Sequence, residues 1–439
     1  MTVKKILSGL LTAALLAAAA GGGYYAVREL TKSEQTTVVY TDDGKVVAGG
    51  RHSLFGGETE EIVVREKEEE VPDNRYLSEE EAGEVRLPYA VEYYSSLLPE
   101  EQEIVCRQLY NGIKNFDETI YITKDVVDSD EITELIVMCM TSAPAVDYID
   151  SNYSVTVDAS GYVSAVEVTY SMTREDSEAR SFLLNKSMGD IISHAASGMS
   201  DFDKFRYIHD CLIKGCTYDE EAEDAYTAYG CLVSGRAVCE GYSKALMMLC
   251  NAMGLPCLPV VGQGIDDMGN SQGHMWNEVM IDGKWYATDI TWDDPIFDGS
   301  DSYVRYDFFA LTDEMMGKNH VKDDNKFFAP PACVSEDADY FVYTDCYVRD
   351  MDGAYDALRN AVLTAMSSGD DYARIKCADD ETFTKCLSWV FGEGTGAEDI
   401  FRLLKEGAGE NPDMGYSITG YSVINNKTCR TISVRLKRE

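Results

Sequence analysis

The chain has 439 residues, more than a single hydrophobic core usually holds, so we expect two or three folded units. Its 38 basic and 77 acidic residues give a formal net charge of −39, which repels a phosphate backbone and argues against nucleic acid as a partner. Hydrophobic residues make up 45% of the chain, which predicts a folded body and not a disordered one.

Residues 1–29 have the pattern of an export signal. Two lysines precede an apolar run over residues 6–20, and small residues follow it. Counted through Val27, the run is about 20 residues long, which is also enough for one membrane-spanning helix. We therefore predict a cleaved signal or an anchor formed by residues 6–27. In both cases the body is extracytoplasmic, and it is either secreted or held at the cell membrane by this segment alone.

The thirteen cysteines do not indicate a dense disulfide framework. Their odd number leaves at least one free thiol if all pairing is internal. Several of them fall in helix-like apolar patterns, where a thiol behaves as a small hydrophobic side chain: Cys106, Cys211, Cys250 and Cys386. No CxxC pair occurs, so we predict no metal site, and no pattern indicates a cofactor.

Two units precede the most informative part of the chain. Residues 30–86 are polar and increasingly acidic, which predicts a linker, with a short hairpin around Asp42-Asp43-Gly44. Residues 87–199 are predicted to form a small α+β module. Pro99 opens a helix in this module, and alternating apolar residues on both sides of Asp158-Ala-Ser-Gly161 predict a β-hairpin.

A buried helix is predicted to begin at Cys239. Apolar residues recur at helical spacing through Met253, and Gly254 and Pro256 then end the pattern. A thiol in the first turn faces free N–H groups and the positive end of the helix dipole, which stabilise a thiolate. The backbone N–H of Cys239 is also a candidate oxyanion donor. On this segment alone, a buried core cysteine explains the pattern equally well.

A β-hairpin is predicted downstream, with arms at residues 275–281 and 284–290 and the turn Asp282-Gly283. Pairing the residues that flank this turn makes His274 and Asp289 diagonal neighbours on one face of the hairpin. At roughly 7 Å, a carboxylate can accept a hydrogen bond from an imidazole and fix its tautomer. A lone histidine is more often structural, but this pair downstream of a helix-opening cysteine indicates a catalytic triad.

Residues 336–439 are predicted to form a small α/β module without catalytic features. Its expected elements alternate between strands and helices: strand 340–347, helix 354–367, strand 372–377, helix 382–404 and strand 416–436.

Three motifs around the proposed triad resemble the transglutaminase-like superfamily: Cys239-Glu-Gly241-Tyr242, His274-Met-Trp276 and Asp289-Ile-Thr291-Trp292. The resemblance covers residues 200–329, and we assign the domain to residues 200–335. It implies an α+β fold of the papain-like/transglutaminase-like type, in which a nucleophile helix packs on an antiparallel sheet. It also implies Cys239 as nucleophile, His274 as base and Asp289 as the group that orients the histidine. A papain-like peptidase shares this order, but the short separation of Cys239 from His274 favours the transglutaminase-like arrangement.

The resemblance implies acyl transfer through a thioester on Cys239. Attack by water makes the protein a peptidase or deamidase, and attack by a lysine amine makes it a crosslinking enzyme. Hydrolysis is favoured because water is abundant outside the cell. We expect a monomeric body that acts on a protein or peptide at the cell surface. The alternative is a catalytically inactive module that binds a peptide or wall component on the same fold. The intact triad favours catalysis.

Other side chains receive weaker assignments. Four aromatic residues are candidates for the substrate cleft or a second oxyanion donor: Tyr226, Tyr229, Trp276 and Trp292. The remaining histidines have no partner at an informative spacing, so we expect structural or surface positions for His52, His194, His209 and His320.

Overall fold

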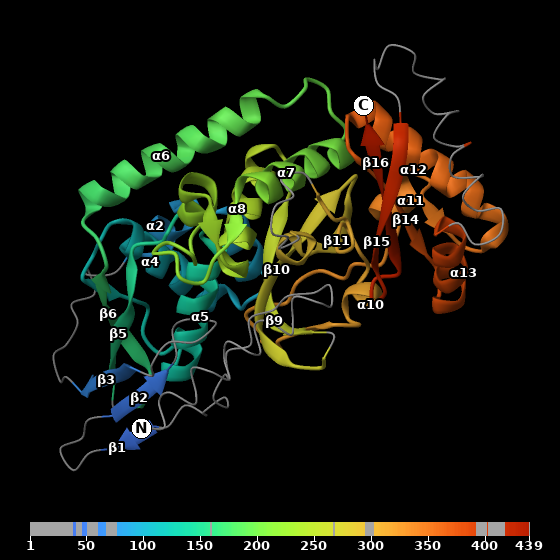
Figure 1. The fold of residues 1–439 in the computed structure, drawn as a ribbon. Helices are drawn as coiled ribbons and strands as arrows, with labels where there is room; N and C mark the ends of the chain where they lie inside the picture. The colour runs from blue at the N-terminus through green and yellow to red at the C-terminus, as the bar shows by residue number, and fades with distance from the viewer. Residues whose placement is uncertain are drawn as a thin grey trace, which may run out of the picture.

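A computed structural model of the protein shows three successive groups of helices and strands (Figure 1). It describes residues 38–40, 46–50, 60–66, 77–158, 160–266, 268–294, 303–391, 402 and 418–438. The signal or anchor predicted for residues 1–29 lies outside the described residues, as does His52. Within those ranges, no helix combines the length and the apolar character that crossing a membrane requires.

The N-terminal group packs helices against a sheet of strand order β1-β2-β3-β5-β6-β4. Its elements are α2 (Glu79–Glu84), α3 (Tyr89–Ser95), α4 (Glu100–Lys114), α5 (Ser129–Ser142), β1 (Val38–Tyr40), β2 (Val46–Gly50), β3 (Glu60–Glu66), β4 (Thr119–Tyr121), β5 (Ile149–Val157) and β6 (Val163–Tyr170). Two predictions are confirmed, because Pro99 is the N-cap of α4 and a hairpin joins β5 to β6. The long helix α6 (Arg174–Ser193) then leads to the central group (Figure 1).

The acidic linker predicted for residues 30–86 is wrong for the described parts of this segment. Strands β1 and β2 form the hairpin expected around residues 42–44, with Val38 opposite Ala48. Strand β3 then joins the sheet of the N-terminal group by pairing in parallel with β5. The β-branched run Ile62-Val63-Val64 is a strand signal, and the surrounding glutamates obscured it in the sequence pattern.

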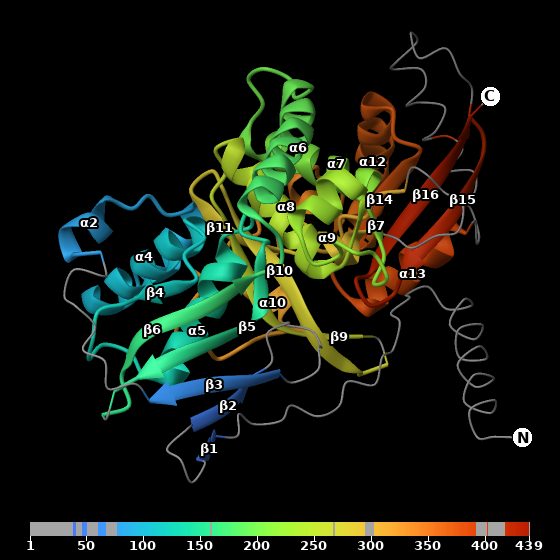
Figure 2. The same ribbon diagram turned by 90° about the vertical axis from the view of Figure 1, so that its left-hand side faces the viewer.

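The central group consists of a buried helix, α8 (Cys239–Ala252), packed on an antiparallel sheet of order β11-β10-β9-β12 (Figure 2). This is the predicted arrangement of the core. Its other elements are α7 (Asp201–Gly215), β7 (Thr217–Tyr218), the π-helix η1 (Gly230–Ser234), β8 (Arg236–Ala237), β9 (Cys257–Ile265), β10 (Ser271–Ile281), β11 (Lys284–Thr288), α9 (Ile290–Asp293), α10 (Asp313–Met316) and β12 (His320–Lys322).

The hairpin of β10 and β11 has the predicted register but a shorter second arm. Ile281 pairs with Lys284, as expected from the Asp282-Gly283 turn, and the ladder ends at Asn277 and Thr288. The expected continuation of the strand to residue 290 is wrong, because Asp289 is the N-cap of α9. Its carboxylate accepts the N–H groups that begin this short helix, which stabilises the helical turn over a further strand pair.

A buried ion pair links β10 to β12. Glu278 is fully buried, and its Oε1 lies 2.5 Å from Nζ of Lys322, which also lies 2.7 Å from Oδ1 of Asp313. Burial raises the pKa of Glu278 to about 7, against the opposing effect of Lys322. The lysine is therefore the group that holds this carboxylate in its charged form inside the sheet.

Lys322→Met is expected to lower the free energy of unfolding by about 3 kcal/mol at pH 8, because Glu278 then lacks its buried counter-charge. The loss shrinks at pH 5, because the carboxyl of Glu278, whose pKa in the folded chain is about 7, is then protonated there and needs no counter-charge. Urea unfolding at both pH values measures it. Lys326→Met is the matched control, since its exposed pair with Glu131 contributes at most about 1 kcal/mol. Equal losses in the two variants would contradict this account.

The C-terminal group has a sheet of order β13-β14-β16-β15. Its elements are α11 (Tyr340–Tyr343), β13 (Tyr347–Val348), the 3-10 helix η2 (Met351–Gly353), α12 (Ala354–Ser368), β14 (Tyr372–Cys377), α13 (Asp380–Val390), β15 (Ile418–Asn426) and β16 (Thr431–Arg438). The helix predicted at 354–367 and the strand at 372–377 are confirmed. The predicted helix at 382–404 begins earlier, at Asp380, and residues 392–401 lie outside the described residues.

Two strand predictions in this group are wrong. The first half of 340–347 is the helix α11, because Asp339 caps it by accepting the N–H groups of Phe341 and Val342. The single strand expected over 416–436 is a hairpin of β15 and β16.

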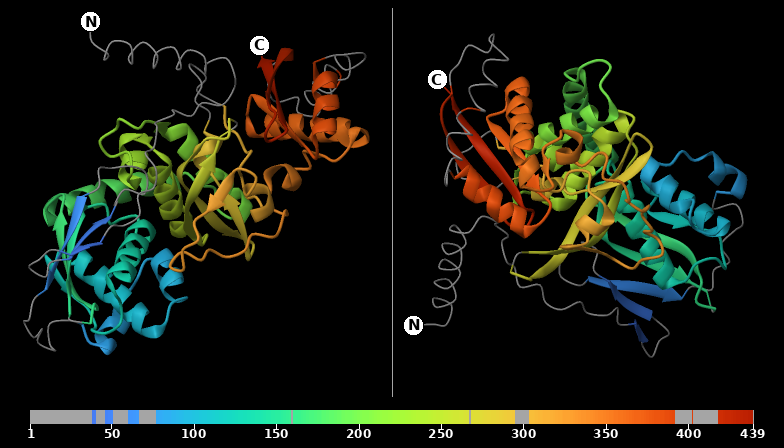
Figure 3. Two further views of the ribbon diagram at one scale, coloured as in Figure 1. Left: turned by 90° about the horizontal axis from the view of Figure 1, so that it is seen from below. Right: turned by 90° about the vertical axis from the view of Figure 1, so that its right-hand side faces the viewer.

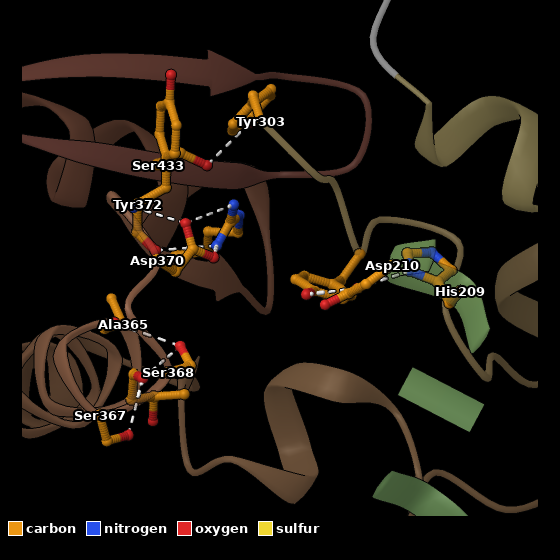
Figure 4. A network of polar contacts seen from close by, with 12 residues as sticks. His209, Asp210, Tyr303, Ala365, Ser367, Ser368, Asp370, Tyr372 and Ser433 are labelled. Atoms are coloured by element: carbon orange, nitrogen blue, oxygen red, sulfur yellow. Dashed lines mark hydrogen bonds and ion pairs between the residues drawn. The ribbon is translucent and has the colours of Figure 1, made fainter. Parts of the chain in front are cut away.

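A buried arginine fastens the C-terminal group to the central one. The guanidinium of Arg374 lies 2.6 Å from Asp370 and faces three aromatic rings at 5.3–5.4 Å, those of Tyr303, Tyr306 and Tyr372. The hydroxyl of Tyr306 donates to Asp210 of α7 at 2.9 Å. Figure 4 shows this network from His209 and Asp210 to Ser433 of β16. The N-terminal and C-terminal groups lie on opposite sides of the central group (Figure 3).

Candidate active site

The thiol of Cys239 stands at the first residue of α8, directly after the extended residue Val238. The residue is 6% exposed, so little of its surface is open to a substrate carbonyl. The N–H groups of a first helical turn have no acceptor within the helix and form the positive end of its dipole. The predicted helix start is confirmed, and it sets the thiol where a thiolate is stabilised.

The residues that follow the thiol explain its motif. A Cβ on Gly241 would lie 2.5 Å from the carbonyl oxygen of Ala225 and 2.9 Å from that of Thr227, so only glycine lets this loop cross the helix. The hydroxyl of Tyr242 donates to Asp294 at 2.5 Å, just beyond α9. The motif therefore fixes α8 against the loop before it and against the segment that carries Asp289.

The imidazole of His274 projects from β10 and is 2% exposed. Its Nε2 lies 2.7 Å from Oδ2 of Asp289. The predicted diagonal pairing of these two residues is thus present as a direct hydrogen bond. Gly264 of β9 makes room for it, because a Cβ there would lie 3.3 Å from the His274 side chain. The thiol of Cys239 is among the groups that raise the pKa of His274, which places the sulfur beside the imidazole, so the three side chains follow one another.

A second histidine binds the same carboxylate. Nε2 of His320 lies 3.0 Å from Oδ2 of Asp289, and its Nδ1 lies 2.8 Å from Oδ1 of Asn319. The expectation that His320 is a structural or surface group is therefore incomplete, because it belongs to the triad's environment. His320 reaches the site through β12, which pairs with β9 and not with the hairpin.

The carboxylate of Asp289 is fully occupied by donors. Oδ1 accepts the backbone N–H of Thr291 at 2.9 Å and that of Trp292 at 3.2 Å, while Oδ2 faces His274 and His320. Burial alone raises the pKa of a carboxyl, but here His274 and the hydrogen bonds outweigh it and hold the pKa of Asp289 far below its usual range. Asp289 is therefore an anion fixed in one orientation.

The same contacts give the two histidines opposite protonation. Burial lowers the pKa of His274, but the charge of Asp289 and the hydrogen bonds to Asp289 and Cys239 outweigh it and raise this pKa to about 10. Burial and the charge of His274 lower the pKa of His320 against the pull of Asp289. His274 is thus an imidazolium beside the sulfur, and His320 is a neutral donor.

Metal binding is not needed to explain this cluster. His274, Asp289 and His320 place one ligand atom each within 4.8 Å of one another, as do Glu278, Asp313 and Cys333. In the first group, N–H donors already occupy the carboxylate oxygens. In the second group, Lys322 forms ion pairs with both carboxylates. Hydrogen bonds and ion pairs account for both.

The two tryptophans enclose the histidines. The ring centroid of Trp276 lies 6.1 Å from that of His274 and 5.0 Å from that of His320. For Trp292 the corresponding distances are 5.4 Å and 4.4 Å. They are 1% and 5% exposed, so they exclude water from the histidine side of the triad and do not line an open cleft.

The tyrosines proposed for the cleft separate into two classes. The ring of Tyr229 is covered by the guanidinium of Arg180 at 3.9 Å, which is a packing role. Tyr226 is 38% exposed, on the loop that precedes the thiol.

Tyr218 of β7 was not among the site residues predicted from the sequence. Burial, followed by the nearby charges of Cys239 and other groups including Asp289, raises the pKa of Tyr218, which places its hydroxyl beside the site.

The other histidines behave as expected. His209 is buried in α7, and its Nε2 lies 3.1 Å from Oδ2 of Asp293, next to Asp210. His194 is an exposed C-cap whose Nδ1 lies 2.6 Å from the carbonyl oxygen of Asp190. Neither contacts the triad through these groups.

Comparison with known proteins identifies the central group. Residues 189–290 match the family model of the transglutaminase-like superfamily. Kyphoscoliosis peptidase of Mus musculus is 25% identical over 158 residues, which cover 33% of this chain and 23% of the mouse protein. The chain therefore matches less than a quarter of the length of that curated relative.

Two solved structures are similar to part of the chain. A TGase is 18% identical over 40% of this chain and 50% of its own, with a TM-score of 0.24. A putative cysteine protease from Cytophaga hutchinsonii is 14% identical over 37% and 55%, with a TM-score of 0.23. The matched segment of the family model contains all three triad residues. Residues 189–290 thus belong to a domain of the transglutaminase-like superfamily, a family of cysteine-dependent enzymes.

Proposed function

We propose that the protein transfers acyl groups from protein or peptide amides through a thioester on Cys239. The observation that carries this proposal is the continuous chain from the Cys239 thiol through His274 to a buried, fully hydrogen-bonded Asp289. A purely structural role does not require a charged histidine next to a thiol at a helix start.

Each side chain has a defined role in this reaction. The Cys239 thiolate attacks the amide carbonyl, and the backbone N–H of Cys239 donates to the oxyanion that forms. His274 then gives its proton to the departing amine, leaving the thioester. Asp289 remains ionised and keeps the imidazole in the tautomer that can next accept a proton from the incoming nucleophile.

Hydrolysis is favoured for the second step. Water reaches any thioester that an extracellular substrate can reach, whereas crosslinking needs a bound lysine. Tyr226 is a partly exposed side chain among the described residues around Cys239. None of these described residues forms a recognisable binding site for a lysine amine. The protein would then act as a peptidase or deamidase.

The place of action is part of the proposal. The basic and apolar pattern of residues 1–29 supports export of the body, with residues 6–27 as a cleaved signal or as an anchor. Fractionation of cells that express the full chain tests it. Recovery of the body in the cytoplasm would contradict export.

The activity test offers the purified protein casein together with a fluorescent primary amine, and follows both amine incorporation and newly formed amino termini. We expect new amino termini or released ammonia from the native protein and none from Cys239→Ala. Cys211→Ala, which removes a thiol of α7, is the matched control and should keep the activity. Fluorescent casein would instead establish crosslinking. No reaction in either assay, with Cys239 inert to alkylation, would support the inactive binding module.

His320→Phe is expected to lower kcat about tenfold with KM unchanged, because it removes one donor from the Asp289 carboxylate and loosens the orientation of His274. His320→Gln should recover part of kcat, since its amide can still donate to Asp289. Steady-state kinetics of both variants separates kcat from KM. A raised KM with normal kcat would show that His320 acts on substrate binding instead.

A further inference from the structure

A β-turn upstream of the nucleophile carries Tyr226. The backbone N–H of Thr227 donates to the carbonyl oxygen of Asp224 at 3.0 Å, which closes a turn over residues 224–227, called the tyrosine turn below. The hydroxyl of Thr227 donates to the same carbonyl oxygen at 2.9 Å. Tyr226 is the third residue of the turn and is 38% exposed. The turn thus holds an aromatic side chain at the protein surface.

The tyrosine turn packs on the start of α8. The carbonyl oxygen of Ala225 accepts the N–H of Val238, the residue directly before the nucleophile, at 2.9 Å. From the second turn of α8, Nζ of Lys244 lies 3.4 Å from the carbonyl oxygen of Tyr226. The backbone on both sides of the tyrosine ring is therefore fixed next to the helix start that holds the nucleophile.

An arginine from a different element holds the first residue of this turn. Arg180 lies in α6, the long helix between the N-terminal and central groups (Figure 1). Its Nη2 lies 2.8 Å from Oδ1 of Asp224 and 3.1 Å from Oδ2 of Asp147, which precedes β5 in the N-terminal group. The guanidinium also covers the ring of Tyr229 at 3.9 Å. The three charged side chains are at most 25% exposed, so water screens the two ion pairs only in part.

We propose that Arg180 is a positioning residue for the peptide substrate and acts through Asp224 on the turn that carries Tyr226. In this proposal the ring of Tyr226 contacts the peptide beside the reacting amide, where an aromatic ring offers apolar area and a polar hydroxyl together. The ion pair with Arg180 fixes the position of that ring, because Asp224 is the residue from which the turn begins. The inference rests on the proposed acyl transfer and extends it to a residue of α6.

Arg180→Met is expected to raise KM about fivefold, the scale of one ion pair, and to leave kcat nearly unchanged. The methionine leaves the Asp224 carboxylate without its counter-charge, so the carboxylate turns toward water and the turn shifts with it. Alkylation of Cys239 by iodoacetamide should stay native, because this small reagent needs no contact with the turn. Asp147→Asn is the matched control, since it removes only the other ion pair and should lower stability without raising KM.

A double variant tests whether Arg180 acts through the tyrosine. Tyr226→Ala should itself raise KM, and adding Arg180→Met to it should raise KM no further. Arg180→Lys keeps a positive charge near Asp224 and should restore part of the native KM. Three results would overturn the proposal: a native KM in Arg180→Met, independent increases in the double variant, or an increase in Asp147→Asn as large as that in Arg180→Met.

Amide hydrogen exchange gives a readout that does not need turnover. The N–H of Thr227 donates within the turn, and the N–H of Gly230 donates to Oγ1 of Thr227 at 3.0 Å. Both amides should exchange faster in Arg180→Met and at the native rate in Asp147→Asn. Native exchange in Arg180→Met, in a protein that transfers acyl groups, would overturn this inference alone. Absence of acyl transfer by the native protein would instead overturn the proposed function, and the substrate role of Arg180 with it.

Discussion

Asp289→Asn is expected to lower kcat/KM by about 10³- to 10⁴-fold, the scale seen when the acid of a catalytic triad becomes an amide. The cause lies in the four donors around this side chain. Two imidazole N–H groups converge on Oδ2, and two backbone N–H groups converge on Oδ1. An asparagine has one acceptor oxygen and one NH₂ group, so neither of its two orientations can satisfy all four donors.

Both orientations of the asparagine amide disturb the site. If the amide NH₂ faces the histidines, His274 must turn or change tautomer, and its imidazolium loses the neighbouring negative charge. If the NH₂ faces the backbone, it repels the N–H groups of Thr291 and Trp292, and the start of α9 is distorted. In both cases His274 is no longer a charged acid aligned with Cys239, so acyl transfer fails at its first step.

A matched variant separates this effect from a loss of stability. Asp293→Asn changes another fully buried carboxylate of the same segment, one that binds His209 at 3.1 Å and the N–H of Phe308 at 2.9 Å. Both variants should unfold more easily in urea. Only Asp289→Asn should lose turnover per folded molecule, measured by the initial rate after titrating the folded fraction. Similar turnover losses in the two variants would show that Asp289 has no specific role in the reaction.

The parts of the site that could be predicted are those set by short-range rules. The start of α8 at Cys239 follows from apolar periodicity, and the pairing of His274 with Asp289 follows from a two-residue turn that fixes the hairpin register. Both depend on residues close in sequence. The conversion of the strand end into α9 was missed although Asp289 is a good helix cap, because alternation along the strand gave the opposite indication.

The parts that could not be predicted come from contacts between distant elements. His320 follows Asp289 by 31 residues and meets it only because β12 pairs with the far side of β9. Tyr218 lies near the thiol and belongs to a two-residue strand. In the C-terminal group, the aromatic run from Tyr340 to Tyr343 has strand propensity, but the cap supplied by Asp339 makes it helical. Neither periodicity nor composition shows these tertiary choices.

His274→Ala is expected to make Cys239 about 10²-fold less reactive toward iodoacetamide at pH 6, with little difference near pH 9.5. In the native protein the pKa of His274 is about 10, raised from its ordinary value near 6.5. The imidazolium therefore persists at pH 6, and its positive charge supports attack by the neighbouring sulfur. Without it, an ordinary thiol ionises near pH 8.5, so its alkylation falls about tenfold for each pH unit below that.

The same pair makes a pH-dependent contribution to stability with a defined sign. Because the folded pKa of His274 is raised, its contribution is complete below about pH 6.5 and is lost as the pH rises toward 10. The lowered pKa of Asp289 makes its contribution complete above about pH 4, and that contribution is lost only in stronger acid. The difference in unfolding free energy between native protein and His274→Ala should therefore be largest between about pH 4 and 6.5 and should shrink by pH 10.

The control for both measurements is His209→Ala. It removes another buried histidine, which binds Asp293 and Asp210 outside the triad. This variant should lose stability but keep the native pH profile of alkylation, because the sulfur still faces a charged His274. A native profile that already rises tenfold per pH unit between pH 6 and 8 would mean that sulfur and imidazole do not form an ion pair. In that case the three triad residues would have a structural role alone. The catalytically inactive binding module would then explain the protein better than acyl transfer does.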